Sequence, residues 1–140
     1  MKRSAFSLME LMIVVVILGL LASFVLPNLT GQSSKAKKKL VCVQMQSIKD
    51  SLRMFKVDNG TYPTTEEGLE ALVKNPDEKK YRNFDENGYF TDGYLPKDSW
   101  GNPFVYLYED GDLELISLGS DNKEGGNDEG KDITYKGCRK

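Results

Sequence analysis

The sequence predicts an α+β fold in which a long N-terminal helix packs on a small antiparallel sheet. Three features carry this prediction: an almost unbroken apolar run at residues 6–26, a helical apolar stripe within 41–55, and strand patterns at 104–108 and 113–117. Helical periodicity that gives way to strand periodicity, without alternation of the two, is typical of α+β architecture. The residues that follow the apolar run are enough for one domain with a modest core.

The apolar run reads FSLMELMIVVVILGLLASFVL and contains one carboxylate, Glu10. A helix of about 20 residues crosses the ~30 Å hydrocarbon core of a bilayer, so the run predicts a membrane-spanning helix. Lys2 and Arg3 precede it and predict a cytoplasmic N-terminus, with the rest of the chain on the other side. A carboxylate within a bilayer is costly and needs a partner. The alternative is a plain single-pass anchor whose Glu10 snorkels to the interface.

The helical pattern continues beyond the apolar run. Pro27 is the expected position of a kink, because proline removes one backbone hydrogen bond and clashes with the preceding turn. Gly60 suits the left-handed conformation that ends a helix. An apolar stripe recurs at steps of four and three residues, which indicates an amphipathic helix with a globular partner: Val41, Met45, Ile48, Leu52 and Phe55.

The segment after this helix predicts a second, short helix at 65–74. Thr64 and Glu67 have the spacing of a capping box ahead of it, and Asn75-Pro76 would stop it. Residues 77–96 show no periodicity. The two strands follow, joined by a turn at 109–112, and a weak last strand is expected at 133–135.

Composition excludes several functions. The 19 basic and 21 acidic residues give a net charge of −2, which offers no case for nucleic-acid binding. The chain has no histidine and no recognisable nucleophile or phosphate loop, so we do not expect an enzyme. One local basic group is expected to be a solvated helix face, with contact to acidic lipid or to neighbouring subunits as the alternative: Lys35, Lys37, Lys38 and Lys39.

The two cysteines are Cys42 and Cys138. In an oxidising compartment they can form a disulfide that ties the long helix to the end of the chain. Two free thiols are the alternative. A Cys-x-x-Cys redox motif is absent from the sequence, which argues against a catalytic dithiol.

Residues 119–132 form an acidic, glycine-rich stretch. Calcium takes six to eight oxygen ligands from carboxylates and carbonyls, and flexible glycines allow carbonyls to turn inward. The register of an EF-hand is missing. Composition alone therefore favours a solvated acidic loop and leaves calcium open. The stretch contains five carboxylates and two amides: Asp121, Glu124, Asp128, Glu129, Asp132, Asn122 and Asn127.

The N-terminal segment KRSA followed by FSLME resembles the class III signal of type IV pilins and pseudopilins. The resemblance implies cleavage between Ala5 and Phe6 by a prepilin peptidase, with N-methylation of Phe6. This family usually has glycine where this chain has Ala5. It also implies that Glu10 of one subunit pairs with the Phe6 amine of its neighbour in a fibre. Such a pair would offset the desolvation of both charges and set the axial register.

Three further segments narrow the resemblance. They resemble segments of the major pseudopilins of type II secretion: NGTYPTTEEGL at 59–69, DSWGNP at 98–103, and SLGSD at 117–121 followed by Gly125-Gly126. In the second segment, Ser99 stands where proline is usual. The resemblance implies a pilin-like fold and a helical homopolymer that drives protein export. It implies as partners minor pseudopilins, the inner-membrane assembly platform and the prepilin peptidase.

The resemblance also places the protein and its parts. It implies an inner-membrane protein with one span, with a periplasmic C-terminal domain. The expected parts are a leader at 1–5, a membrane and fibre-core helix at 6–26, and a periplasmic domain at 27–140 made of a helix at 27–58, a variable region at 59–100, and a sheet with a calcium loop at 101–140.

One calcium ion is implied in the acidic loop. The carboxylates carried over by motif are Asp121 and Asp128, with Asn127 as a substitute for Asp128. The carbonyls are those of Leu118, Lys123 and Gly126. A pilin of a type IV pilus or DNA-uptake system, and a membrane-anchored binding domain that never polymerises, remain the alternative functions.

Overall fold

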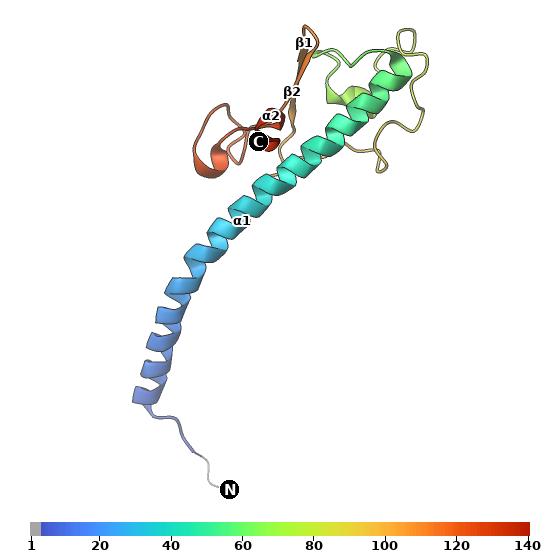
Figure 1. Cartoon of the computed structure of the whole chain (residues 1–140). Helices are drawn as coiled ribbons and strands as arrows, with labels where there is room; N and C mark the ends of the chain where they lie inside the picture. The colour runs from blue at the N-terminus through green and yellow to red at the C-terminus, as the bar shows by residue number, and fades with distance from the viewer. Residues whose placement is uncertain (1–3) are drawn as a thin grey trace. The chain divides into compact units, whose positions relative to one another are not determined.

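The computed structural model describes residues 4–140, and for residues 25–30 it describes the backbone only. It confirms the α+β class, with one long helix and a small antiparallel sheet (Figure 1). The chain divides into two compact units, Met1–Ala36 and Lys37–Lys140, which are described separately. The predicted leader cations Lys2 and Arg3 lie outside the described residues.

Helix α1 (Leu8–Asn59) begins at a serine cap. The N–H of Glu10 donates to Oγ of Ser7 at 3.1 Å, and the N–H of Leu11 donates to the Ser7 carbonyl at 3.1 Å. The first bond satisfies an N–H group that a helix start leaves without a partner, and the second is the first regular bond of the helix. The helical backbone continues through residues 25–30. Among the described residues, no helix combines the length and apolarity that crossing a membrane requires.

The predicted apolar stripe of α1 is the centre of the core of the second unit. All five of its side chains are 0% exposed. Phe55 packs edge-to-face against Tyr81 and Tyr89, with ring centroids 4.9 and 5.4 Å apart. The helix ends at Asn59, and Gly60 has φ +82° and donates its N–H to the Lys56 carbonyl at 2.7 Å, as a left-handed cap requires.

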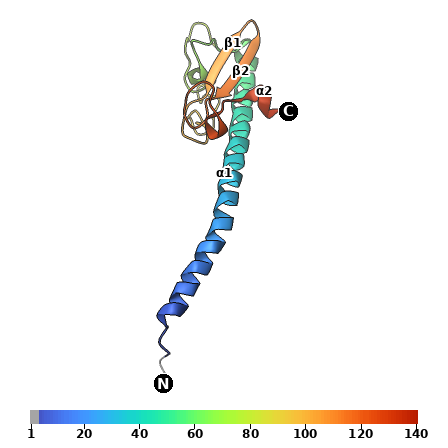
Figure 2. The same ribbon diagram turned by 90° about the vertical axis from the view of Figure 1, so that its left-hand side faces the viewer.

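The sheet has three strands in the order β1-β2-β3: β1 (Val105–Glu109), β2 (Asp112–Ser117) and β3 (Ile133–Thr134). Asp110 and Gly111 form the two-residue β1–β2 turn with φ of +50° and +82°, which matches the twist of a hairpin. Figure 2 shows the hairpin beside the C-terminal part of α1. Leu113 and Leu115 of β2 belong to the same core as the helix stripe. The predicted turn at 109–112 is therefore shorter than expected.

The predicted helix at 65–74 is wrong. Residues 65–68 form turns, and only the short 3-10 helix η1 (Leu69–Leu72) follows. The capping box is nevertheless present, because Thr64 and Glu67 each donate a backbone N–H to the other's side chain. Thr65 is held by the sheet, since its hydroxyl bonds both the carbonyl and the N–H of Tyr108. Gly68 has φ +63°, so an α-helix cannot pass through this position.

The C-terminal segment differs from the expected strand at 133–135. Strand β3 ends at Thr134, whose hydroxyl accepts from the Gly137 N–H at 3.0 Å and caps a short helix, α2 (Tyr135–Cys138). A disulfide joins Cys138 to Cys42 of α1, with Cα atoms 5.6 Å apart. The Tyr135 hydroxyl donates to Oε1 of Gln46 at 2.8 Å. The end of the chain is thus attached to the long helix.

Candidate functional site

The residues of the predicted processing point are accessible. Ser4 to Ser7 have no regular structure, and Phe6 is 82% exposed just before α1. Glu10 lies in the first turn of α1 and is exposed. The predicted cleavage point therefore lies in a segment without regular structure, and the predicted assembly acid lies in the first turn of the adjoining helix.

Asp98 organises the DSWGNP segment. The residue is 5% exposed, and its Oδ1 accepts from the N–H groups of Trp100 at 3.0 Å and Asn102 at 2.8 Å. Oδ2 accepts from the hydroxyl of Ser117, the last residue of β2, at 2.8 Å. These three donors give both oxygens of the buried carboxylate a hydrogen-bond partner, as burial of a polar group requires.

The acidic loop leaves the sheet at this point. Ser117 pairs with Ile133 of β3, so the two ends of the loop meet there. The Ser117 hydroxyl also accepts from the Gly119 N–H at 3.3 Å, and the Gly119 carbonyl accepts from Nδ2 of Asn102 at 3.0 Å. Leu118, the first predicted carbonyl ligand, therefore lies between two residues held by the DSWGNP segment.

The carboxylate of Asp121 points into the loop. Its Oδ1 accepts from the Lys123 N–H at 3.0 Å. A Cβ atom on Gly126 would lie 3.0 Å from its Oδ2, and one on Gly130 would lie 2.9 Å from the same oxygen. Glycine at these two positions thus gives the carboxylate the room to approach the backbone. Three of the predicted ligand residues, Asp121, Lys123 and Gly126, are thus brought together.

Asp132 is a further candidate ligand that the motif comparison did not propose. Its Oδ2 accepts from the Gly125 N–H at 2.9 Å. Its Oδ1 is buried and, within the described part of the chain, has no hydrogen-bond partner. An unpaired buried carboxylate oxygen is costly, and a cation would relieve the cost. The sequence offered no signal for this role, since Asp132 is one of five acids in the loop.

The remaining predicted ligands are Leu118 and Asp128. Leu118 is half-buried, and Asp128 is exposed, as Asp121 is. Asp128 opens the 3-10 turn η2 (Asp128–Gly130) with φ +52°. Among the residues that the structure describes, no three His, Cys, Asp or Glu side chains are grouped to hold a metal. A calcium site here would rest on the carboxylates of Asp121 and Asp128 and on carbonyl oxygens. That donor set is of the kind calcium accepts.

A separate charged cluster supports the segment at 64–81. Glu67 accepts from Nζ of Lys80 at 2.9 Å and from the Tyr81 hydroxyl at 2.6 Å. Burial alone would raise the pKa of Glu67, but these bonds and the Thr64 N–H outweigh it and hold the pKa below its usual value. Burial chiefly raises the pKa of Tyr81. The cluster therefore joins the two ends of this segment and has a structural role.

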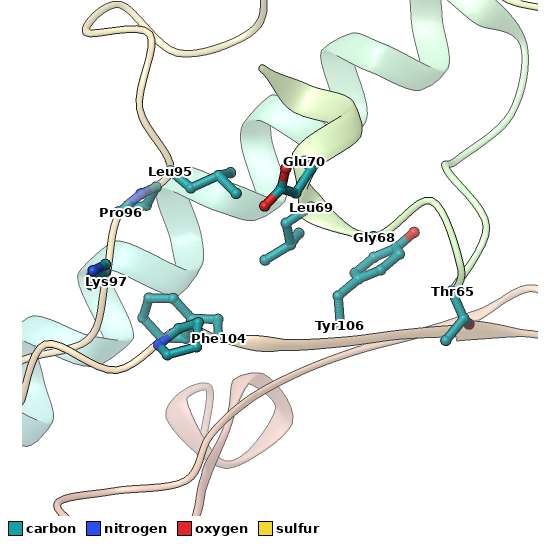
Figure 3. A pocket seen from close by; sticks show the side chains of 10 residues that line it. Thr65, Gly68, Leu69, Glu70, Leu95, Pro96, Lys97, Phe104 and Tyr106 are labelled. Carbon is teal, nitrogen blue, oxygen red and sulfur yellow. The ribbon is translucent and has the colours of Figure 1, made fainter. Parts of the chain in front are cut away.

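One cavity of about 430 Å³ lies between the 65–70 segment, residues 95–97 and β1 (Figure 3). Its lining is mostly apolar, with Glu70 and Lys97 as its charged residues. Tyr106, one of its walls, donates its hydroxyl to the Pro63 carbonyl at 2.8 Å, and burial raises its pKa. None of the predicted site residues lines this cavity.

Comparison with known proteins identifies the family. The family described as "Type II secretion system (T2SS), protein G" matches residues 28–136, and the "Prokaryotic N-terminal methylation motif" matches residues 1–26. Type II secretion system core protein G of Vibrio cholerae is 46% identical over 134 residues, which cover 94% of this chain and 90% of that protein. The protein of the same name from Pseudomonas aeruginosa is 44% identical, with 94% of each chain covered.

A solved structure agrees with these relatives. The crystal structure of the major pseudopilin from the type 2 secretion system of enterohaemorrhagic Escherichia coli matches with a TM-score of 0.64 and 34% identity, and the match covers 77% of this chain and 93% of that one. The relatives favour secretion over the pilus and DNA-uptake alternatives. The chain therefore belongs to the type II secretion system protein G family, the major pseudopilins.

Proposed function

We propose that this chain polymerises into a periplasmic pseudopilus that drives protein export across the outer membrane. The observation that carries the proposal is the pair of adjoining family matches at 1–26 and 28–136, which join an N-methylation motif to a protein G domain. Minor pseudopilins and an inner-membrane assembly platform are the other proposed partners. The chain acts through packing and charge pairing and is not an enzyme.

The N-terminal segment provides the membrane anchor and then the core of the fibre. Large apolar side chains of α1 in the first unit are exposed within this chain, among them Ile13 at 54% and Leu18 at 60%. Exposed apolar surface of this extent needs a cover, which lipid provides before assembly and neighbouring helices provide afterwards. The Cys42–Cys138 disulfide supports an oxidising compartment such as the periplasm for the second unit.

Processing prepares the assembly contact. Cleavage between Ala5 and Phe6 releases an amine at Phe6, whose reference pKa of about 7.7–8.0 keeps it largely cationic at neutral pH. In the fibre this amine pairs with Glu10 of a neighbouring subunit. Phe6 and Glu10 are both exposed in the single chain, as such a contact requires.

Substitution of Glu10 tests the assembly contact. Glu10→Ala should insert into the membrane and be cleaved normally but form no fibres in cells. Ser7→Ala is the matched control, because it removes the cap of the same helix turn and keeps the carboxylate. Normal fibres from Glu10→Ala would overturn the charge-pair proposal.

A calcium ion would complete the acidic loop. The carboxylates of Asp121 and Asp128 and the carbonyls of Leu118, Lys123 and Gly126 would hold it, with Asp132 as an additional carboxylate. The ion would neutralise a loop in which like charges repel each other, and a folded loop gives neighbouring subunits a defined surface. The inward carboxylate of Asp121 and the unpaired oxygen of Asp132 support this proposal.

Thermal unfolding in calcium and in chelator tests the ion. The wild-type chain should melt at a higher temperature in calcium, and Asp121→Ala should abolish the difference. Asp92→Ala, which removes an exposed carboxylate outside the loop, should keep it. Identical wild-type melting curves in calcium and chelator would refute the calcium proposal.

Deletion of the gene separates secretion from DNA uptake. Loss of a secreted protein with unchanged transformation supports the proposal. Loss of transformation with normal secretion would favour the DNA-uptake alternative.

A further inference from the structure

The start of the acidic loop is held by side chains that are not themselves placed as calcium ligands. Asp98 has its two oxygens occupied by the N–H groups of Trp100 and Asn102 and by the Ser117 hydroxyl. Nδ2 of Asn102 donates a hydrogen bond to the Gly119 carbonyl at 3.0 Å. The two residues therefore fix the backbone on both sides of Leu118.

The same contacts determine where the first ligands of the loop point. Gly119 is buried, and a Cβ there would lie 2.6 Å from the Glu129 carbonyl, so the two limbs of the loop are in close contact at this residue. The Ser120 N–H donates to the Glu129 carbonyl at 2.9 Å and continues this contact. Asp121 is the next residue. A rotation at Gly119 would thus displace both the Leu118 carbonyl and the Asp121 carboxylate.

We infer that Asp98 and Asn102 are positioning residues that set the calcium affinity of the loop. The inference rests on the proposed calcium binding and adds a function to the DSWGNP segment. Metal affinity depends on the groups that orient the ligands, and their loss typically weakens binding by about 10- to 100-fold. The DSWGNP segment thus orders the backbone of the ligand residues in the calcium-free chain.

The experiment is a calcium titration by isothermal calorimetry of the full-length chain in detergent micelles. Asn102→Ala should raise the Kd for calcium about 10- to 100-fold. Asn75→Ala is the matched control, because its Nδ2 also bonds a backbone carbonyl, that of Tyr81, at 3.0 Å in another loop. Asn75→Ala should leave the Kd for calcium unchanged, even if it lowers the melting temperature as much as Asn102→Ala does.

A second variant separates positioning from electrostatics. Asn102→Asp keeps the shape of the side chain but replaces the donor to Gly119 with an oxygen. A general charge effect predicts tighter calcium binding, because the variant adds a negative charge, whereas loss of positioning predicts weaker binding. If Asn102→Ala does not fold, Ser117→Ala removes the hydroxyl bond to Asp98 and should also raise the Kd.

The outcomes distinguish the two proposals. A wild-type Kd in Asn102→Ala or Ser117→Ala, or tighter binding in Asn102→Asp, overturns the positioning role and leaves calcium binding intact. A wild-type chain that takes up no calcium refutes the calcium proposal, and the positioning role is refuted with it.

Discussion

The Ser117 hydroxyl donates to Oδ2 of Asp98 at 2.8 Å, and both residues are almost wholly buried. This bond joins the DSWGNP segment to the end of β2, where the acidic loop begins. A carboxylate in this position is stabilised only as long as its three donors remain. The contact thus connects two of the family's recurring segments through one side chain.

Substitution of Asp98 should destabilise the fold. Asp98→Ala leaves two backbone N–H groups and one hydroxyl without a partner, and we expect the free energy of unfolding to fall by about 3 kcal/mol. Asp77→Ala is the control, since Asp77 also accepts two backbone N–H bonds but is exposed. It should cost about 1 kcal/mol or less. Urea denaturation measures both, and equal losses would contradict the role of burial.

The disulfide should contribute strongly to stability. It closes a loop with a sequence separation of 96 residues. In the chain-entropy model the double variant Cys42→Ser, Cys138→Ser should lose about 4–5 kcal/mol of unfolding free energy. A reductant should lower the urea midpoint of the wild type and leave that of the double variant unchanged. An unshifted wild-type midpoint under reductant would show that the bond adds no stability.

Alanine substitutions at the neighbouring Gly125 and Gly126 should have very different effects on calcium binding. A Cβ at Gly126 would lie 2.5 Å from the Gly130 carbonyl oxygen and 3.0 Å from Oδ2 of Asp121, whereas a Cβ at Gly125 meets nothing within 4 Å. Both have positive φ, so alanine brings similar backbone strain to each. If the loop binds calcium as proposed, Gly126→Ala should abolish the calcium-dependent rise in melting temperature, and Gly125→Ala should keep most of it. Equal effects of the two substitutions would contradict the proposed position of the calcium ligands around Asp121.

Acid should destabilise the protein partly through Glu67. Its pKa is lower in the folded chain than in the unfolded chain, so the folded state binds fewer protons. Its stabilisation is fully present above the unfolded value of about 4.3 and is lost as the pH falls through the folded pKa. Glu67→Gln should flatten the fall in melting temperature between about pH 5 and 2. Glu70→Gln, which removes an exposed acid nearby, is the control and should leave this fall in melting temperature unchanged. If Glu67→Gln also left it unchanged, Glu67 would not be a source of the acid destabilisation.

Local periodicity explains which elements were predictable. The stripe from Val41 to Phe55 is wholly buried, as predicted, because burial of one helix face follows directly from its spacing in the sequence. The Gly60 cap and the β1–β2 hairpin depend on neighbouring residues and were predicted for the same reason. The helix at 65–74 was not found, because Thr65 bonds Tyr108 of β1, a contact between residues far apart in the chain.

The candidate site likewise contains residues that the sequence indicated and residues that only the folded structure revealed. Motif comparison proposed Asp121 and Gly126, which the fold brings together, but not Asp132, whose unpaired oxygen arises from burial in the folded loop. Nothing in the sequence indicates that Asp98 bonds Ser117.

The sequence by itself determined the long helix, its buried face, the small sheet and the family, because these follow from local spacing and from recurring segments. The tertiary structure alone decided how the loop is held, through Asp98 and Asn102 at its start and the Cys42–Cys138 bond beyond its end. The physical reason is that a buried polar group needs partners, and those partners come from residues that only folding brings together.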